Sequence, residues 1–294
     1  MDTIKRFLHR YVGFMLVLCS CSSGRFAANS TFPMPEPGYI PDGTLEEVFY
    51  SSSAGGPSHR RMLVYLPPGY DDGADRYPVL YLLHGARGNE LSWINEGRVL
   101  QNMDSLTRCG KMQKTIVVFP NMNRYKDEED FGKSRKKNAL ESSFGTDGGV
   151  ETMFVTEVVS VADSIFRTIP HKEARAVAGL SIGAYQTVQI SATFPDAFGY
   201  VGVFSPVIRT YAVKGPFRHF YKGLYGKMKM QFADAPKVYC IMSGRNDVFY
   251  PRIQRLVMHM EAEKYPFEFI PTSGGHTWTN WEEYSVLFMQ KLWK

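Results

Sequence analysis

The stretch of sequence that decides the fold is Arg175-Ala176-Val177-Ala178-Gly179-Leu180-Ser181-Ile182-Gly183. Its first half is a short apolar run, typical of a buried strand, and residues 182–194 follow with a helical pattern. Glycines on both sides of a serine relieve crowding in a sharp strand-to-helix turn, which lifts the hydroxyl out of a sheet. The five-residue pattern alone recurs by chance, but in this context it predicts a nucleophile elbow at Ser181.

Similar short apolar runs recur along the chain and alternate with longer amphipathic stretches. This alternation predicts an α/β fold in which a mostly parallel sheet carries helices on both faces. Residues 46–51 and 60–66 predict an antiparallel hairpin at the edge of that sheet. The other expected strands are 79–83, 115–119, 174–180, 200–204, 238–242 and 267–271, and the expected helices are 91–107, 150–168, 182–194, 252–264 and 279–292.

Two segments interrupt the alternation. Residues 123–147 mix acidic and basic side chains at a density that is typical of a solvated loop. Residues 208–234 carry many aromatic side chains and follow an expected strand, a place from which an insertion can cap a site. We therefore predict one α/β domain over residues 44–294, with a possible cap segment at 208–234.

A serine hydroxyl becomes a useful nucleophile only when a base takes its proton. In a fold with this elbow the acid and then the histidine follow the serine in the sequence. His219 falls in the expected cap and His259 in the middle of an expected helix. His276 follows an expected strand through a Gly-rich loop, so we predict that it is the base.

The acid of the triad should lie between Ser181 and His276. Asp247 follows the expected strand 238–242, at the edge of the sheet where the serine also lies. Asp196 follows a proline and is typical of a turn or cap, and Asp234 precedes its strand. We therefore predict Asp247 as the acid.

The oxyanion of a tetrahedral intermediate needs two hydrogen-bond donors. The backbone N–H of Ile182, at the start of a helix, is the first expected donor. The second is expected from the loop His84-Gly85-Ala86-Arg87-Gly88, with Ala86 preferred to its neighbour Arg87. His84 precedes the serine in the sequence, so we expect it to brace this loop and not to serve as the base.

Four motifs occur together and in order: 77–85 (YPVLYLLHG), 179–183 (GLSIG), 243–247 (SGRND) and 274–278 (GGHTW). With these motifs the chain, from about residue 46 to its end, resembles the esterase D-like putative esterases. That group includes feruloyl and acetylxylan esterases of carbohydrate esterase family one and the mycolyltransferases. The resemblance implies an α/β-hydrolase fold with the triad Ser181, Asp247 and His276, and it implies no metal and no organic cofactor.

The first twenty residues predict a signal peptide, with basic residues before an apolar run that is too short for a comfortable transmembrane helix. Leu18-Cys19-Ser20-Cys21 resembles a bacterial lipobox, which predicts lipidation at Cys21 and a periplasmic or outer-membrane lipoprotein; ordinary cleavage without a lipid is the alternative. Residues 21–43 are rich in Ser, Pro and Gly and predict a tether.

The net charge bears on nucleic-acid binding, and the cysteine content bears on disulfide formation. Loss of residues 1–20 lowers the formal net charge from +5 to +3, and the remaining basic residues are scattered, which gives no reason to expect nucleic acid. A disulfide between Cys109 and Cys240 would suit an oxidising compartment. A chain of this size can nevertheless bury a sufficient core without one, so we expect two unpaired, buried thiols.

An exported enzyme of this group is expected to hydrolyse acyl or feruloyl esters of plant-polysaccharide fragments, with Arg87 and Trp278 as candidate substrate contacts. For Trp278, helix packing is an equal alternative. Acyl transfer of the mycolyltransferase type, thioester or siderophore-ester hydrolysis, and an inactive glycan-binding lipoprotein remain open. The leader argues against a cytoplasmic glutathione-thioester hydrolase. The oligomeric state is not predicted.

Overall fold

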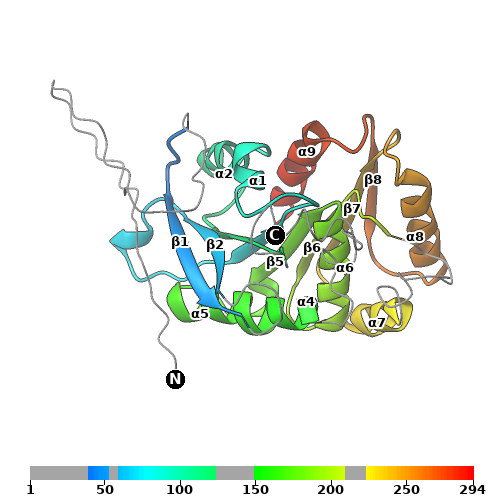
Figure 1. Cartoon of the computed structure of the whole chain (residues 1–294), viewed down its shortest axis with the longest axis horizontal. Helices are drawn as coiled ribbons and strands as arrows, with labels where there is room; N and C mark the ends of the chain where they lie inside the picture. Colours follow the sequence, from blue (N-terminus) through cyan, green and yellow to red (C-terminus); the bar gives the residue numbers. More distant parts are fainter. Residues whose placement is uncertain (1–38, 53–58, 124–148, 209–222) are drawn as a thin grey trace.

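The computed structural model describes residues 39–52, 59–123, 149–208 and 223–294. Within these residues the chain forms one eight-stranded sheet in the order β1-β2-β4-β3-β5-β6-β7-β8, flanked by helices (Figure 1). The strands are β1 (Thr44–Ser51), β2 (His59–Leu66), β3 (Val79–Leu83), β4 (Ile116–Pro120), β5 (Arg175–Leu180), β6 (Tyr200–Phe204), β7 (Val238–Gly244) and β8 (Glu268–Thr272).

The sheet has the predicted mixture of directions. β1 pairs with β2 and β2 with β4 in antiparallel register, and every later pairing from β4 to β8 is parallel. The edge hairpin and the parallel body of the sheet are thus both confirmed. Because parallel strands all end at one edge, the loops after β3, β5, β7 and β8 meet there.

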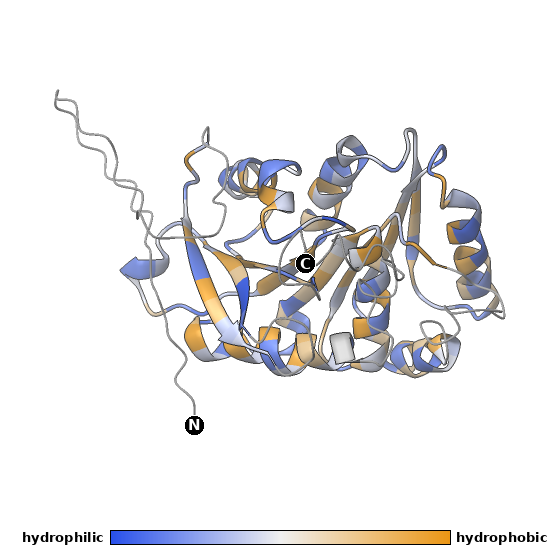
Figure 2. Cartoon of the chain, viewed as in Figure 1, coloured by the Kyte–Doolittle hydropathy of each residue, from blue (hydrophilic) through white to orange (hydrophobic). Residues whose placement is uncertain are grey.

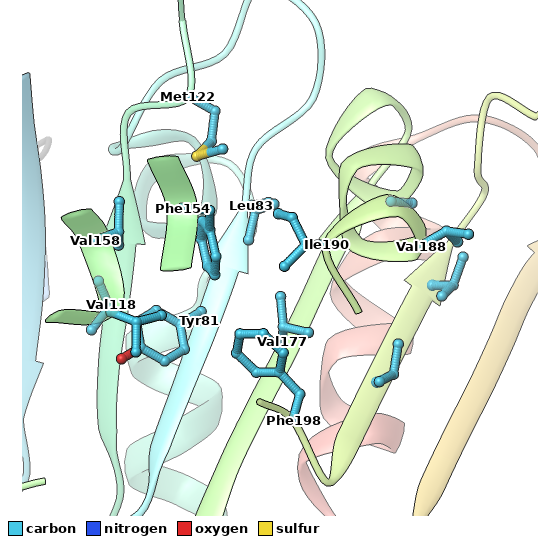
Figure 3. Close-up of a cluster of buried hydrophobic side chains, with 14 of the residues drawn as sticks. Tyr81, Leu83, Val118, Met122, Phe154, Val158, Val177, Val188, Ile190 and Phe198 are labelled. Carbon is cyan, nitrogen blue, oxygen red and sulfur yellow. The ribbon is translucent and has the colours of Figure 1, made fainter. Parts of the chain in front are cut away.

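Alternate residues of each central strand enter two different apolar cores. In β3, Val79, Tyr81 and Leu83 belong to one core, and Leu80 and Leu82 to the other. Figure 3 shows Tyr81 and Leu83 in the first core, where Tyr81 packs edge-on against Phe154 and Phe198. This period-two alternation is what a strand buried on both faces requires.

Helices cover both faces, as predicted. The face of the first core carries α4 (Gly149–Met153), the π-helical segment η2 (Phe154–Val159), α5 (Ser160–Ile165), α6 (Ile182–Thr193), α7 (Leu224–Gln231) and α8 (Tyr250–Ala262). The other face carries α1 (Ser92–Asn95), α2 (Val99–Arg108) and α9 (Trp278–Met289). Short 3₁₀ turns are η1 (Tyr70–Asp72), η3 (Lys172–Ala174) and η5 (Phe232–Asp234). Hydrophobic residues gather on the strands, and hydrophilic ones colour the outer side of α8 (Figure 2).

The predicted helix 91–107 is divided into α1 and α2. Between them Arg98 adopts a left-handed backbone conformation, with φ 47°. The break allows Trp93 of α1 to meet Trp278 of α9 edge-on at 5.4 Å. Gly97 lies at the break, where a Cβ would be 2.8 Å from Trp93 and 3.0 Å from Trp278. The low helix propensity of glycine and the packing of the two tryptophans thus both favour the break.

The described part of the predicted cap is a crossover connection instead. Residues 224–234 form α7 and η5, and the buried Met228 joins the core of that face. Lys227 Nζ donates to Oγ1 of Thr193, which is the last residue of α6. Lys172, which lies just before β5, donates through Nζ to Asp234 Oδ2. These contacts lie at the end of the sheet opposite Ser181, so residues 223–234 do not cap the site. Residues 209–222 lie outside the described residues.

The two cysteines of the domain are unpaired, as predicted. Cys240 is buried within β7, and burial raises the pKa of its thiol to about 12. Cys109 at the end of α2 is exposed, which corrects the expectation that both thiols are buried. In the part of the chain that the structure describes, no helix has the length and apolar character needed to cross a membrane.

Candidate active site

Ser181 stands at a sharp turn between β5 and α6. Its backbone has φ 55° and ψ −113°, a region that costs a non-glycine residue energy, and its N–H donates to the carbonyl of Phe204 on the neighbouring strand. A Cβ at Gly183 would lie 2.4 Å from the carbonyl oxygen of His84, so glycine is required for the close approach of α6 to β3. The elbow predicted from the sequence is therefore present.

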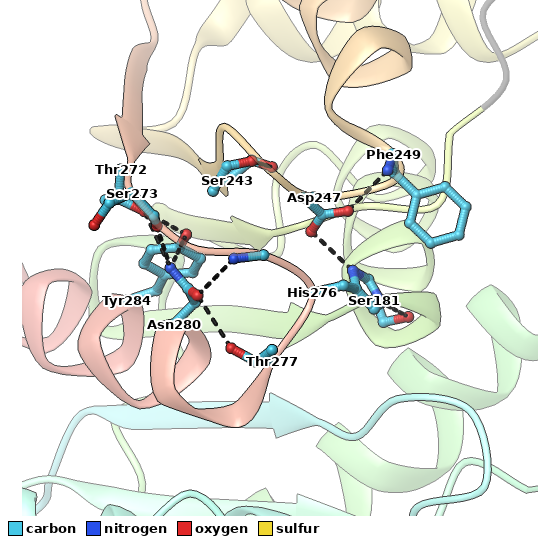
Figure 4. Close-up of polar contacts among 12 residues, drawn as sticks. Ser181, Ser243, Asp247, Phe249, Thr272, Ser273, His276, Thr277, Asn280 and Tyr284 are labelled. Carbon is cyan, nitrogen blue, oxygen red and sulfur yellow. Dashed lines mark hydrogen bonds and ion pairs between the residues drawn. The ribbon is translucent and has the colours of Figure 1, made fainter.

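The three predicted triad residues come together at the carboxyl edge of the sheet (Figure 4). His276 Nε2 lies 2.9 Å from Ser181 Oγ, and His276 Nδ1 lies 2.8 Å from Asp247 Oδ2. Ser181 and Asp247 are both buried. The imidazole can therefore accept the serine proton through one nitrogen while it donates to the carboxylate through the other.

Asp247 is held as an anion by its hydrogen bonds. Burial raises the pKa of this carboxyl, but hydrogen bonds from His276 and from the backbone N–H of Phe249 outweigh burial and hold the pKa below its ordinary value. The N–H of Phe249 donates to Asp247 Oδ1 at 2.8 Å, which leaves Oδ2 for His276. The acid thus presents a fixed oxygen to the base.

The loops that carry the acid and the base are tied to each other. The N–H of Arg245 donates to Thr272 O at 2.9 Å, and the N–H of Asn246 donates to Gly274 O at 2.9 Å. These bonds continue the parallel pairing of β7 and β8 beyond the sheet. These backbone bonds hold the loop of Asp247 beside the loop of His276.

The loop after β3 forms a tight turn beside the elbow. Gly88 N–H donates to Gly85 O, and Ala86 and Arg87 are the exposed central residues of this turn. His84 accepts from the N–H of Met122 through Nε2, so Nδ1 carries the hydrogen that bonds Gly85 O. Burial lowers the pKa of His84, which keeps it neutral. The expectation that His84 braces the loop is confirmed.

The two predicted oxyanion donors lie on either side of Ser181. Ile182 is the first residue of α6, and the turn of Ala86 lies close by, because a Cβ at Gly85 would be 3.5 Å from the Cβ of Ser181. The N–H of Ile182 belongs to the first turn of α6, where a backbone N–H has no acceptor within the helix. This N–H and that of Ala86 stay the expected donors to a developing negative charge.

The two predicted substrate contacts differ in their surroundings. Arg87 is exposed on the turn beside the elbow, with φ 63°. Trp278 is half-buried and packs edge-on against Trp93 and Trp281. Packing of α9 against α1 accounts for this position of Trp278.

The sequence reasoning missed three residues around the base. Phe249 and Trp281 pack edge-on against the His276 ring, with centroids 5.0 and 4.8 Å away, and Asn280 bonds its loop. Trp281 and Asn280 follow His276 closely on the helical pattern 279–292, where a polar Asn on the buried face is a signal that could have been used. Phe249 lies two residues after the acid, and no pattern distinguished it.

Two proteins with similar sequences are named as esterases. A protein of Xylanibacter ruminicola named endo-1,4-beta-xylanase/feruloyl esterase is 31% identical over 264 residues, which cover 87% of this chain and 32% of that protein. The chain therefore spans about a third of the length of that relative. An acetyl esterase of Caldicellulosiruptor saccharolyticus is 22% identical, over 73% of this chain and 82% of its own length.

Solved structures share the fold. A ferulic acid esterase of carbohydrate esterase family one from Anaeromyces mucronatus superposes with a TM-score of 0.70 at 22% identity, covering 88% of this chain and 93% of its own. An S-formylglutathione hydrolase of Staphylococcus aureus gives a TM-score of 0.64 at 17% identity, covering 88% and 100%. Both show that the fold is that of the α/β-hydrolase esterases.

Fold and site together place the chain among proteins of the α/β-hydrolase type that carry a Ser–His–Asp arrangement at the carboxyl edge of the sheet. The family model described as putative esterase matches residues 53–284, and the chain belongs to that family.

Proposed function

We propose that this chain hydrolyses carboxylic esters through an acyl-enzyme on Ser181. As Ser181 Oγ attacks the ester carbonyl carbon, His276 Nε2 takes the hydroxyl proton across 2.9 Å. Asp247 holds the tautomer of His276 and stabilises the imidazolium that forms. The N–H groups of Ile182 and Ala86 bind the oxyanion. The carbon–oxygen bond to the alcohol then breaks, and the alcohol leaves with the proton from His276.

Water completes the cycle. His276 takes a proton from a water molecule whose oxygen attacks the acyl carbon, and a second tetrahedral intermediate forms. Its collapse breaks the bond to Ser181 Oγ, which recovers a proton from His276, and the carboxylic acid is released. The observation that carries this proposal is the continuous set of hydrogen bonds from Ser181 through His276 to Asp247.

The proposed substrates are acyl or feruloyl esters of plant-polysaccharide fragments. The relative that is 31% identical is named for feruloyl esterase together with xylanase. The Anaeromyces mucronatus enzyme, which shares the fold, has also been solved in complex with ferulic acid. The predicted leader would place the enzyme outside the cytoplasm, anchored through Cys21, where such fragments occur.

The direct test is the Ser181→Ala variant of the purified protein, assayed on p-nitrophenyl acetate and methyl ferulate. We expect turnover to fall by a factor of about 10⁶, because the nucleophile of an acyl-enzyme mechanism is lost. Ser191→Ala is a matched control, since Ser191 is also buried on α6 and its hydroxyl donates to the carbonyl of Val188, three residues earlier on the same helix. Retained turnover in Ser181→Ala would contradict the proposal.

A further inference from the structure

Asn280 lies in the first turn of α9, directly after the loop that carries His276. It is 5% exposed, and its side chain makes hydrogen bonds with residues 272–277 and with Tyr284, one turn further along the helix (Figure 4). A buried amide is stable only if its donors and acceptors are satisfied. Here the partners belong almost entirely to the loop of the catalytic base.

The amide oxygen holds both neighbours of His276 in the chain. Asn280 Oδ1 accepts from the backbone N–H of Gly275 at 3.1 Å and from Thr277 Oγ1 at 3.1 Å. One oxygen therefore ties down the residue before His276 and the residue after it. The backbone of His276 is held between these two points.

The amide nitrogen makes the complementary bonds. Asn280 Nδ2 donates to the carbonyl of Ser273 at 2.7 Å and to Tyr284 OH at 3.0 Å, with Thr272 Oγ1 at 3.2 Å. A backbone N–H on one side and a backbone C=O on the other require an acceptor and a donor, respectively. A carboxamide of this length supplies both, whereas a carboxylate supplies only acceptors.

The loop closes tightly around this amide. Gly274 has φ 82°, and a Cβ there would lie 2.3 Å from Asn280 Oδ1, so only glycine fits. The carbonyl of Gly274 also accepts from Asn246 N–H, next to Asp247. The side chain of Asn280 thus fills the centre of the loop that carries His276, and this loop is hydrogen-bonded to the loop that carries Asp247.

We propose that Asn280 is a positioning residue, which holds His276 within hydrogen-bond distance of both Ser181 and Asp247. The catalytic part of this inference rests on the proposed esterase function. Without the amide, the part-buried N–H of Gly275 and the carbonyl of Ser273 lose the side chain that holds them at fixed positions, which favours a rearranged loop. Small displacements of a catalytic group lower the rate strongly, while substrate binding is less affected.

The test compares Asn280→Ala, Asn280→Asp and a control in purified protein. The control is Asn102→Ala, because Asn102 Nδ2 bonds Glu282 of the same helix α9 and does not touch the loop. We expect kcat on p-nitrophenyl acetate to fall about 10- to 100-fold in Asn280→Ala, with KM nearly unchanged. Asn102→Ala should keep both constants. Asn280→Asp should lose at least as much kcat as Asn280→Ala, because a carboxylate then faces the carbonyl of Ser273.

A second readout does not depend on turnover. The proton that joins His276 Nδ1 to Asp247 should give a low-field ¹H NMR signal in the wild type, assigned by its loss in His276→Ala. We expect this signal to be lost or broadened in folded Asn280→Ala and retained in Asn102→Ala. If no substrate is turned over, the proposed function fails, and this signal alone still decides the role of Asn280.

Circular dichroism verifies that each variant is folded. If Asn280→Ala does not fold, Tyr284→Phe takes its place, because the Tyr284 hydroxyl bonds both Asn280 Nδ2 and Thr272 Oγ1, and its loss loosens the amide and the loop together. Tyr284→Phe is then expected to lower kcat several-fold and to weaken the low-field signal. A folded Asn280→Ala, or in its place Tyr284→Phe, with wild-type kcat and an unchanged signal would overturn the proposal. A loss confined to KM would overturn it too.

Discussion

The backbone of Ser181 adopts a conformation that is costly for a residue other than glycine. A non-glycine residue with φ 55° and ψ −113° is strained by roughly 1–3 kcal/mol, and the surrounding contacts must maintain it. Those contacts are the bond from its N–H to Phe204 and the tight approach of Gly183 to β3. This conformation places the Ser181 hydroxyl outside the sheet, within hydrogen-bond distance of His276. Strain and function therefore coincide at one residue.

The ionisation of Asp247 leads to a prediction about stability and pH. Its pKa is lower in the folded state than the value of about 3.9 expected when unfolded, so the unfolded state binds its proton first as the pH falls. The contribution of Asp247 to stability is thus complete above the unfolded pKa and is lost as the pH falls through the folded pKa.

Urea unfolding of the wild type and Asp247→Asn from pH 7 downwards measures this contribution. We expect the difference in free energy of unfolding between them to be constant near neutral pH and to shift against the wild type below about pH 4. A difference that does not change on acidification, or that shifts in favour of the wild type, would contradict the assigned direction of the Asp247 pKa.

At the scale of the elements, the strands were predictable and the helix boundaries less so. A buried parallel strand is a short apolar run, so each of the eight expected strands lies within a residue or two of its place in the structure. The helix boundaries depend on packing. The predicted helix 91–107 is divided into α1 and α2 beside the contact of Trp93 with Trp278. Residues 224–234, predicted as part of a cap, form a crossover connection in which Met228 is part of the core. Composition alone could not separate that outcome from a cap.

The residues of the candidate site also differ in whether the sequence could predict them. Ser181, Asp247 and His276 each follow a strand, so their convergence followed from the order of the chain and the parallel sheet. Asn280 and Phe249 act through contacts with a loop and a ring. Those contacts depend on the three-dimensional approach of α9 and of the acid loop, and the sequence pattern does not contain that information.

At the scale of the whole molecule, the predicted leader and residues 21–38 of the predicted tether lie outside the described residues. Residues 39–43 of that tether are described, and Tyr39 OH and the N–H of Asp42 both donate to Asp104 of α2. The proposed lipid anchor at Cys21 would hold the hydrolase domain at a membrane through residues 22–43. Acylation contributes about 0.8 kcal/mol for each buried CH₂ group, so a lipoprotein with several chains should remain in the membrane fraction.

Expression in a bacterium with radiolabelled palmitate tests this anchor. We expect the label on the wild-type protein and none on Cys21→Ala, with Cys109→Ala as a control that keeps the label, since Cys109 lies in the folded domain. An unlabelled wild-type protein that is cleaved and released in soluble form would show export without a lipid.

The central claim is that Ser181 is a nucleophile activated by His276, and phosphonylation by a fluorophosphonate tests it most directly. Intact-mass and peptide mass spectrometry of the folded protein should find one adduct, on Ser181. The adduct should be absent in Ser181→Ala and form far more slowly in His276→Ala. Folded wild-type protein that remains unlabelled, or an adduct on another serine while Ser181 stays free, would contradict the account.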